Sequence, residues 1–231
     1  MGETVTIKGQ DGSFSGYLAK PANANGAGIV VIQEIFGVNG FVRAVADDFA
    51  RQGFFALAPD LFWRIEPNVQ LTDKSEAEWK KAFELMGKFQ IDPGVKDIQA
   101  TAAHLRQLPG ANKKVGAVGF CLGGLLAYLT AARTDCDASV GYYGVNIQNF
   151  LGEKGSIKKS LMLHVAEKDR FVPPEAQKQV AEGLKAMPNV TIHTYPGCDH
   201  AFARLGGEHY DKKAADLANT RTADFFKKNL G

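Results

Sequence analysis

Long apolar runs, paired cysteines and an excess of one charge are all missing from this 231-residue sequence. No apolar run reaches the roughly 18 residues that a membrane-spanning helix needs, so we expect no membrane partner. The 27 basic and 25 acidic residues are interspersed and leave a net charge of +2, which does not favour nucleic acid as a partner. No basic segment followed by an apolar one opens the chain, so we expect no signal peptide.

Cysteine is scarce, and its three positions, Cys121, Cys136 and Cys198, cannot all pair. An odd, low count fits a reducing compartment, so we expect a cytoplasmic protein. The sequence has no C-x-x-C, no H-E-x-x-H and no phosphate-binding glycine loop. We therefore expect no metal and no cofactor, and a monomer that acts on a small molecule.

Strands and helices are expected to alternate along a single domain over residues 1–231. This order predicts an α/β fold with a mostly parallel central sheet and helices on both faces. A hairpin is expected at 4–9 and 14–20, with a turn at 10–12. A strand that runs into a loop is expected within 26–37, and further strands at 54–59, 115–120, 138–144, 160–169 and 189–197. Helices are expected at 41–53, 74–89, 95–108, 122–132, 173–187 and 212–230, with Asp92-Pro93-Gly94 separating the second from the third.

The segment "GFCLGG", residues 119–124, lies where a buried strand turns into a helix. It matches the G-x-S-x-G nucleophile elbow with Cys121 in the serine position. Glycines permit the sharp turn that pushes the central side chain outward. A helix N-terminus also favours the thiolate over the thiol. We predict that Cys121 is a nucleophile; the alternative is a buried structural cysteine.

Two further strand ends carry groups that complete a triad. Asp169 follows "LMLHVAEK", and His200 lies in "PGCDHAF" between the last strand and the last helix. The order nucleophile, acid, histidine is that of α/β-hydrolases. His200 would act as general base and then as general acid, and Asp169 would orient its ring. Asp199 is the nearest competitor for that orienting role, and a turn aspartate is the alternative for Asp169.

Two charged residues and two backbone groups extend the candidate site. Glu34 follows an apolar strand and is expected beside the thiol, unless it is a salt-bridged carboxylate at the strand end. Arg204 is a candidate partner for Glu34 or for a substrate carboxylate, with an exposed loop arginine as the alternative. The N–H groups of Leu122 and Ile35 are expected to form the oxyanion hole.

The chain resembles the dienelactone hydrolase (carboxymethylenebutenolidase) family of α/β-hydrolases over nearly its whole length. The resemblance rests on "QEIFGVNGFVRAVADDFARQGFFALAPDLFWR", "GAVGFCLGG", "GYYGV", "AEKDRFVPP" and "GCDHAFAR". It implies a triad of Cys121, Asp169 and His200. It also implies that the thiol rests against Glu34 until a substrate carboxylate engages Arg204 and frees the glutamate. The implied reaction hydrolyses a cyclic enol ester to an oxo acid, a step in degrading chlorinated aromatic compounds.

One departure from the family concerns the substrate. The family carries a second arginine for the substrate carboxylate and a tyrosine one helical turn later. The matching positions here are Trp79 and Phe83, which predicts a less polar lactone or ester, or another carboxylate orientation. Because a thiolate adduct readily expels thiolate again, activated esters and enol lactones fit this nucleophile better than amides do.

Four interpretations remain open at this point. The first is a cysteine-dependent hydrolase of enol lactones or activated esters, and the second is a broader carboxylesterase of the same family. The third is a non-catalytic α/β-hydrolase that binds a small ligand, which the intact triad disfavours. The fourth is a thiol redox enzyme, which the missing C-x-x-C disfavours.

Overall fold

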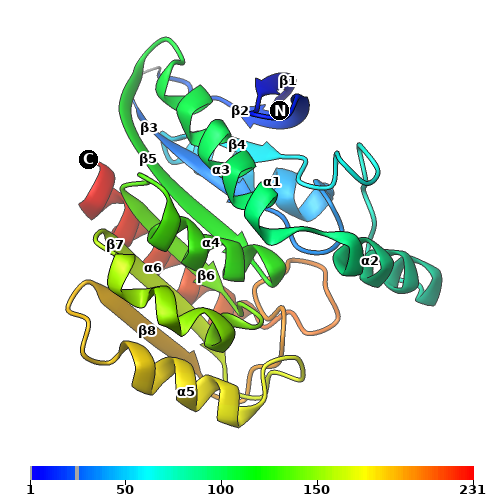
Figure 1. Ribbon diagram of the computed structural model, residues 1–231, viewed down its shortest axis with the longest axis vertical. Coiled ribbons are helices and arrows are strands. Elements are labelled where there is room, and N and C mark those ends of the chain that lie inside the picture. Colours follow the sequence, from blue (N-terminus) through cyan, green and yellow to red (C-terminus); the bar gives the residue numbers. More distant parts are fainter. Residues whose placement is uncertain (1, 24–25) are drawn as a thin grey trace. The chain divides into compact units, whose positions relative to one another are not determined.

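Strands and helices alternate along the chain (Figure 1), and the computed structural model describes residues 2–23 and 26–231. The chain divides into two compact units, Met1–Ala117 and Val118–Gly231. Each unit combines strands with helices, which confirms the α/β class. The single domain over residues 1–231 stays a prediction. Among the described residues, no helix combines the length and the hydropathy that a membrane crossing requires.

The first unit contains four strands in the order β1-β2-β4-β3. Their bounds are β1 (Glu3–Lys8), β2 (Ser13–Ala19), β3 (Gly26–Ile32) and β4 (Phe55–Pro59). The hairpin of β1 and β2 is antiparallel, as predicted, and the Gly9 N–H donates to the Gly12 carbonyl in its turn. β2 pairs antiparallel with β4, whereas β3 and β4 are parallel.

Two of the first unit's three helices cover its sheet. They are α1 (Gly40–Arg51) and α3 (Ile91–Arg106), and both contact β3 and β4. Every residue of β3 and β4 is buried. Strands buried on both sides read as continuous apolar runs, which is why the sequence shows no alternation here. The remaining helix, α2 (Glu76–Lys88), has Ser75 as its N-cap, with the Ser75 hydroxyl accepting from the Glu78 N–H.

The predicted break between the second and third helices is wrong in one respect. Asp92, Pro93 and Gly94 lie inside the first turn of α3 instead of separating it from α2. Proline is tolerated there because the first amides of a helix have no intrahelical acceptor. Gly94 leaves room for the Phe89 ring, since a Cβ atom at position 94 would lie 2.4 Å from the Phe89 ring tip.

β5 (Ala111–Phe120) begins in the first unit and ends in the second. The second unit then contains β6 (Ala138–Tyr142), β7 (Ser160–Ala166) and β8 (Val190–Tyr195). β6 pairs parallel with β7, and β7 pairs parallel with β8. The carboxyl ends of these strands therefore meet at one edge, where ligands bind in open α/β sheets.

Helices lie on both faces of the second unit's strands. α4 (Leu122–Arg133) and α6 (Lys212–Leu230) both contact β6 and β7, with α4 in front and α6 behind in Figure 1. α5 (Pro174–Leu184) opens at a proline, as predicted, and α6 has the predicted bounds. The sequence analysis missed the 3₁₀ helix η1 (Ile147–Ser156), which packs against α4 and α5.

Candidate active site

Cys121 forms the corner between β5 and α4, as predicted. Its backbone has φ 56° and ψ −114°, a left-handed conformation that costs a residue with a Cβ atom about 1–3 kcal/mol. Main-chain hydrogen bonds hold this conformation. The Cys121 N–H donates to the Tyr142 carbonyl at 3.0 Å, and the Cys121 carbonyl accepts from the Gly124 N–H at 2.9 Å. The surrounding backbone therefore imposes the strain, as a nucleophile elbow requires.

The glycines of this segment are explained by close backbone contacts. A Cβ atom at Gly119 would lie 1.9 Å from the Gly123 carbonyl oxygen. A Cβ atom at Gly124 would lie 2.6 Å from the Tyr142 carbonyl oxygen and 2.7 Å from the Gly144 Cα. Only glycine lets strand and helix approach each other this closely.

The expectation of an outward-facing nucleophile needs one correction. Only 8% of the Cys121 surface is exposed, and its N–H and carbonyl groups bind neighbouring backbone. Burial is common to a structural cysteine and to an enclosed nucleophile, so the role of Cys121 stays a prediction.

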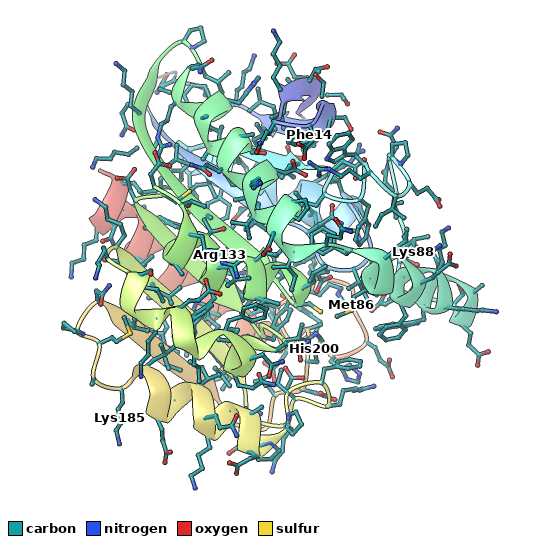
Figure 2. The ribbon with its side chains drawn as sticks, viewed as in Figure 1. Phe14, Met86, Lys88, Arg133, Lys185 and His200 are labelled. Atoms are coloured by element: carbon teal, nitrogen blue, oxygen red, sulfur yellow. The ribbon has the colours of Figure 1, made fainter. Side chains whose placement is uncertain are left out.

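Asp169 and His200 lie together at the carboxyl edge of the second unit. Figure 2 labels His200, which follows β8, while Asp169 follows β7. The His200 Nδ1 lies 2.9 Å from Oδ2 and 3.0 Å from Oδ1 of Asp169. Oδ1 of Asp169 also accepts from the N–H groups of Phe171 at 2.8 Å and Val172 at 3.1 Å. The carboxylate is thus fixed by backbone donors and holds Nδ1 of the ring.

The opposite nitrogen of the His200 ring is buried and available. Within the described part of the chain, Nε2 makes no hydrogen bond. Aromatic rings of Phe171, at 4.8 Å, and Tyr143, at 5.0 Å, pack edge-on against the imidazole. Burial lowers the pKa of His200, but the negative charges of Cys121 and Asp169 outweigh it and raise the pKa to about 10. The ring therefore lies between two acidic groups and holds a proton readily.

Leu122 and Arg204 complete the predicted positions in the second unit. Leu122 is the first residue of α4, so its N–H belongs to the amides that a helix leaves without an intrahelical acceptor. Arg204 lies in the loop before α6 and is only 7% exposed, so the alternative of an exposed loop arginine is wrong. An arginine this buried has its charge compensated or aimed at a ligand.

Glu34 and Ile35 lie in the first unit, directly after β3. Glu34 is 1% exposed and Ile35 is 3% exposed, so both side chains are buried. The neighbouring Gln33 is tied to the segment after β4, because its Oε1 accepts from the Leu61 N–H at 3.1 Å. The loop after β3 passes close to the backbone of Val69 at Gly37, since a Cβ atom at position 37 would lie 2.0 Å from the Val69 carbonyl oxygen.

The structure brings Trp79 and Phe83 together with Phe36, two residues after Glu34. The Trp79 and Phe83 rings stack at 5.5 Å between centroids, and Phe36 meets Trp79 edge-on at 5.0 Å. The Trp79 indole N–H donates to the Asp73 carbonyl at 3.1 Å. Phe83 is 47% exposed, so this aromatic cluster runs from buried Phe36 to solvent.

Two aromatic residues around the proposed triad escaped the sequence analysis. Tyr143 and Phe171 lie inside the quoted segments "GYYGV" and "AEKDRFVPP", but no spacing rule predicts that their rings enclose His200. Asp199 does not orient the ring. It binds Arg170 and the His200 backbone instead. In the described part of the chain, no cluster of three or more His, Cys, Asp or Glu side chains could hold a metal ion.

Comparison with known proteins decides the family. Residues 14–230 match the sequence model of the dienelactone hydrolase family. The chain belongs to the dienelactone hydrolase family. The chain is 38% identical to a carboxymethylenebutenolidase of Pseudomonas putida, over 96% of this chain and 95% of that one. A relative from Azospirillum brasilense, whose name gives the same activity provisionally, is 52% identical over 96% of both chains.

Solved structures agree with this dienelactone hydrolase assignment at the level of the fold. A crystal structure from Klebsiella pneumoniae, provisionally named a dienelactone hydrolase, has a TM-score of 0.86 at 23% identity. It covers 99% of this chain, which covers 98% of it in turn. The fold is therefore that of the α/β-hydrolases, as predicted. The protein is a hydrolase of ester or lactone bonds that resembles carboxymethylenebutenolidase.

Proposed function

We propose that the protein hydrolyses enol lactones or activated esters through a Cys121–His200–Asp169 triad. One observation carries the proposal. The buried His200 ring is held by Asp169 through Nδ1, while Nε2 makes no hydrogen bond in the described part of the chain and the Cys121 charge acts on the ring. A general base needs this arrangement, with one nitrogen oriented and the other available.

The acylation step follows from these positions. Transfer of the Sγ–H proton of Cys121 to Nε2 of His200 gives a thiolate–imidazolium pair, which the raised pKa of His200 favours, and the thiolate then bonds to the substrate carbonyl carbon. The carbonyl electron pair moves to the oxygen, where we assign the Leu122 and Ile35 N–H groups as donors. Collapse breaks the ring C–O bond, and the departing enolate oxygen takes the proton from His200. The opened chain remains attached to Cys121 as a thioester and carries the enol hydroxyl at its other end.

Deacylation reverses the roles. His200 takes a proton from water, and the resulting hydroxide adds to the thioester carbonyl. The adduct expels the Cys121 thiolate, which takes back the proton from His200, and leaves a carboxylic acid. Asp169 keeps its ring partner oriented in both steps, because its carboxylate is fixed by the Phe171 and Val172 amides.

Glu34 and Arg204 are assigned from the family resemblance. Each is buried, at 1% and 7% exposure, which fits charged groups that are paired or that bind a ligand. Arg204 would take a substrate carboxylate. Glu34 would either hold the Cys121 thiol or remove its proton. We further propose a cytoplasmic monomer without metal or cofactor, on the cysteine count and the balanced charge.

The aromatic cluster supports a less polar substrate than the family's carboxylated lactones. Trp79 and Phe83 offer stacked ring faces, with no charged group of their own, at the positions that carry the polar anchors elsewhere in the family. Apolar and aromatic surfaces bind ring faces of a ligand by burial and stacking. We therefore propose that they contact a flat, unsaturated part of the substrate.

A substrate panel tests the proposal. Cis- and trans-dienelactones, with and without a carboxylate, are compared with simple aryl esters on the wild type and on Cys121→Ala. We expect the dienelactones, uncharged ones included, to turn over faster than the simple aryl esters, and Cys121→Ala to lose at least a thousandfold in kcat/KM. Equal rates across the panel would indicate the broader carboxylesterase. Ligand binding without turnover would indicate the non-catalytic binder.

A further inference from the structure

Two loops deliver the acid and the histidine of the proposed triad. Asp169 lies in the loop between β7 and α5, and His200 lies in the loop between β8 and α6. Each loop contributes one more charged residue at the adjoining position, Arg170 and Asp199. These two side chains form an ion pair, in which Nε and Nη2 of Arg170 both donate to the single oxygen Oδ2 of Asp199, at 3.0 and 2.9 Å.

The other oxygen of Asp199 binds the backbone of both loops. Oδ1 accepts from the Arg170 N–H at 3.0 Å and from the His200 N–H at 2.6 Å. One carboxylate oxygen thus joins the amide that follows Asp169 to the amide of His200 itself. The side chains of these two triad candidates also meet, with Nδ1 of His200 2.9 Å from Oδ2 of Asp169.

The charge of Asp199 persists over the working pH range. Burial opposes its ionisation, but hydrogen bonds from Arg170 and from the His200 and Arg170 amides lower the pKa of Asp199 to about 2. The imidazole of His209 contacts the same Nη2 atom of Arg170 that donates to Asp199. Arg170, Asp199 and His209 therefore form one contact group that keeps the guanidinium beside the Asp199 carboxylate.

We propose that the Arg170–Asp199 pair is a positioning clamp that fixes the positions of Asp169 and His200 relative to each other. The inference rests on the proposed triad. Neither residue contacts the reacting groups; Asp199 acts through the His200 backbone. A side-chain carboxylate that binds two loop amides fixes their separation, and sub-ångström placement of a general base governs its efficiency.

Stability arguments alone do not explain this pair. The Arg170 side chain is 47% exposed and that of Asp199 is 25% exposed. Ion pairs this accessible contribute about 0–1 kcal/mol to folding. If the pair acts as a positioning clamp, removing it should lower kcat while the melting temperature stays nearly unchanged.

The test compares graded variants in steady-state hydrolysis of an activated aryl ester. Asp199→Ala removes both amide bonds and should lower kcat ten- to a hundredfold, with KM changed less than threefold. Asp199→Asn keeps an acceptor for the amides and should lose less. Arg170→Ala should lose three- to tenfold.

A second ion pair in the same unit provides the control. Arg133, labelled in Figure 2, binds Glu153 in a bidentate pair with two contacts of 2.7 Å and similar exposure. Arg133 is the last residue of α4 and lies about 18 Å along the helix from Cys121. Arg133→Ala and Glu153→Gln should leave kcat within twofold of the wild type.

A spectroscopic readout separates the clamp from the proposed function. The proton between His200 Nδ1 and Asp169 is expected as a downfield resonance in proton NMR, and Asp199→Ala should broaden it or speed its exchange with solvent. If the wild type hydrolyses no ester but this resonance responds to Asp199→Ala, the triad's activity fails and the clamp stands. Wild-type kcat and an unchanged resonance in Asp199→Ala would overturn the clamp. Should Asp199→Ala not fold, the same criteria apply to Asp199→Asn and Arg170→Ala.

Discussion

Cys121 occupies a backbone conformation that its own side chain disfavours. Its φ of 56° is maintained because the Tyr142 carbonyl and the Gly124 amide bind the peptide groups on either side. Strain of this kind persists only where surrounding structure over-determines it, and it is common at reactive positions. This strained conformation lowers the stability of the fold and fixes the position of the Cys121 thiol.

Replacing Cys121 by glycine or alanine measures that strain. Both variants should be inactive, but Cys121→Gly should be more stable than Cys121→Ala by about 1 kcal/mol, because glycine adopts positive φ without penalty. Chemical denaturation gives the two free energies of unfolding. Cys136, which is buried outside the positive-φ residues, is the control. At that position, Cys136→Ala should be more stable than Cys136→Gly. If the same replacement is the more stable one at both positions, the proposed strain at Cys121 is contradicted.

His200 provides the second prediction at the scale of single residues. Its pKa is raised to about 10 by Cys121 and Asp169 in opposition to burial. Removing the thiol in Cys121→Ala removes one of the two negative charges, so the pKa of His200 should fall relative to the wild type. Titration of the imidazole ring protons by NMR measures both values. A pKa that is unchanged in Cys121→Ala would mean that the two side chains do not interact.

Helix α4 approaches β6 so closely that glycine is required between them. Gly124 faces the Tyr142 carbonyl and Gly144, and an added methyl group would meet backbone atoms on both. Backbone cannot move aside as a flexible side chain can, so overpacking here displaces the whole helix. Because Cys121 precedes α4, that displacement would move the proposed nucleophile.

Gly124→Ala should therefore reduce both stability and activity. We expect a loss of about 2–3 kcal/mol in the free energy of unfolding, together with a loss in kcat of at least tenfold. Gly152→Ala is the matched control, because nothing lies within 4 Å of an added Cβ atom there. Its stability should match or exceed that of the wild type, and so should its kcat. Equal stabilities of the two variants would mean that α4 has room to shift.

Elements with strong local patterns were predictable from the sequence, and contacts between loops were not. α6 has the predicted bounds because its polar start and its apolar spacing are local features. η1 was missed because a 3₁₀ helix has weaker periodicity and depends on packing against α4 and α5. The Asp169–His200 contact was predicted from strand ends. The Arg170–Asp199 pair joins residues 29 positions apart on two loops and leaves no periodic signal.

At the scale of the whole molecule, the buried His164 links the stability of the fold to pH. His164, on β7, is 1% exposed, and its two ring nitrogens meet the Tyr195 hydroxyl at 2.8 Å and the Thr222 hydroxyl at 2.9 Å. These contacts tie β7 to β8 and α6. Burial, with further contributions from His193 and Arg221, lowers the pKa of His164 well below 6.5. The folded protein therefore keeps this ring neutral under conditions where the unfolded chain protonates it.

The free energy of unfolding should fall as the pH drops below about 6.5. In that range the unfolded state binds a proton at His164 that the folded state does not, so this group contributes a slope of up to about 1.4 kcal/mol per pH unit. Urea denaturation between pH 7.5 and 4.5 measures it. His164→Gln lacks the titrating group and should show a shallower slope, although its stability at pH 7.5 is reduced. His104→Gln, which removes a less buried histidine on α3, should keep most of the wild-type slope. If the His164 ring stays neutral in the folded state, the wild type must show a steeper pH slope than His164→Gln. Parallel slopes would mean that the acid response arises elsewhere.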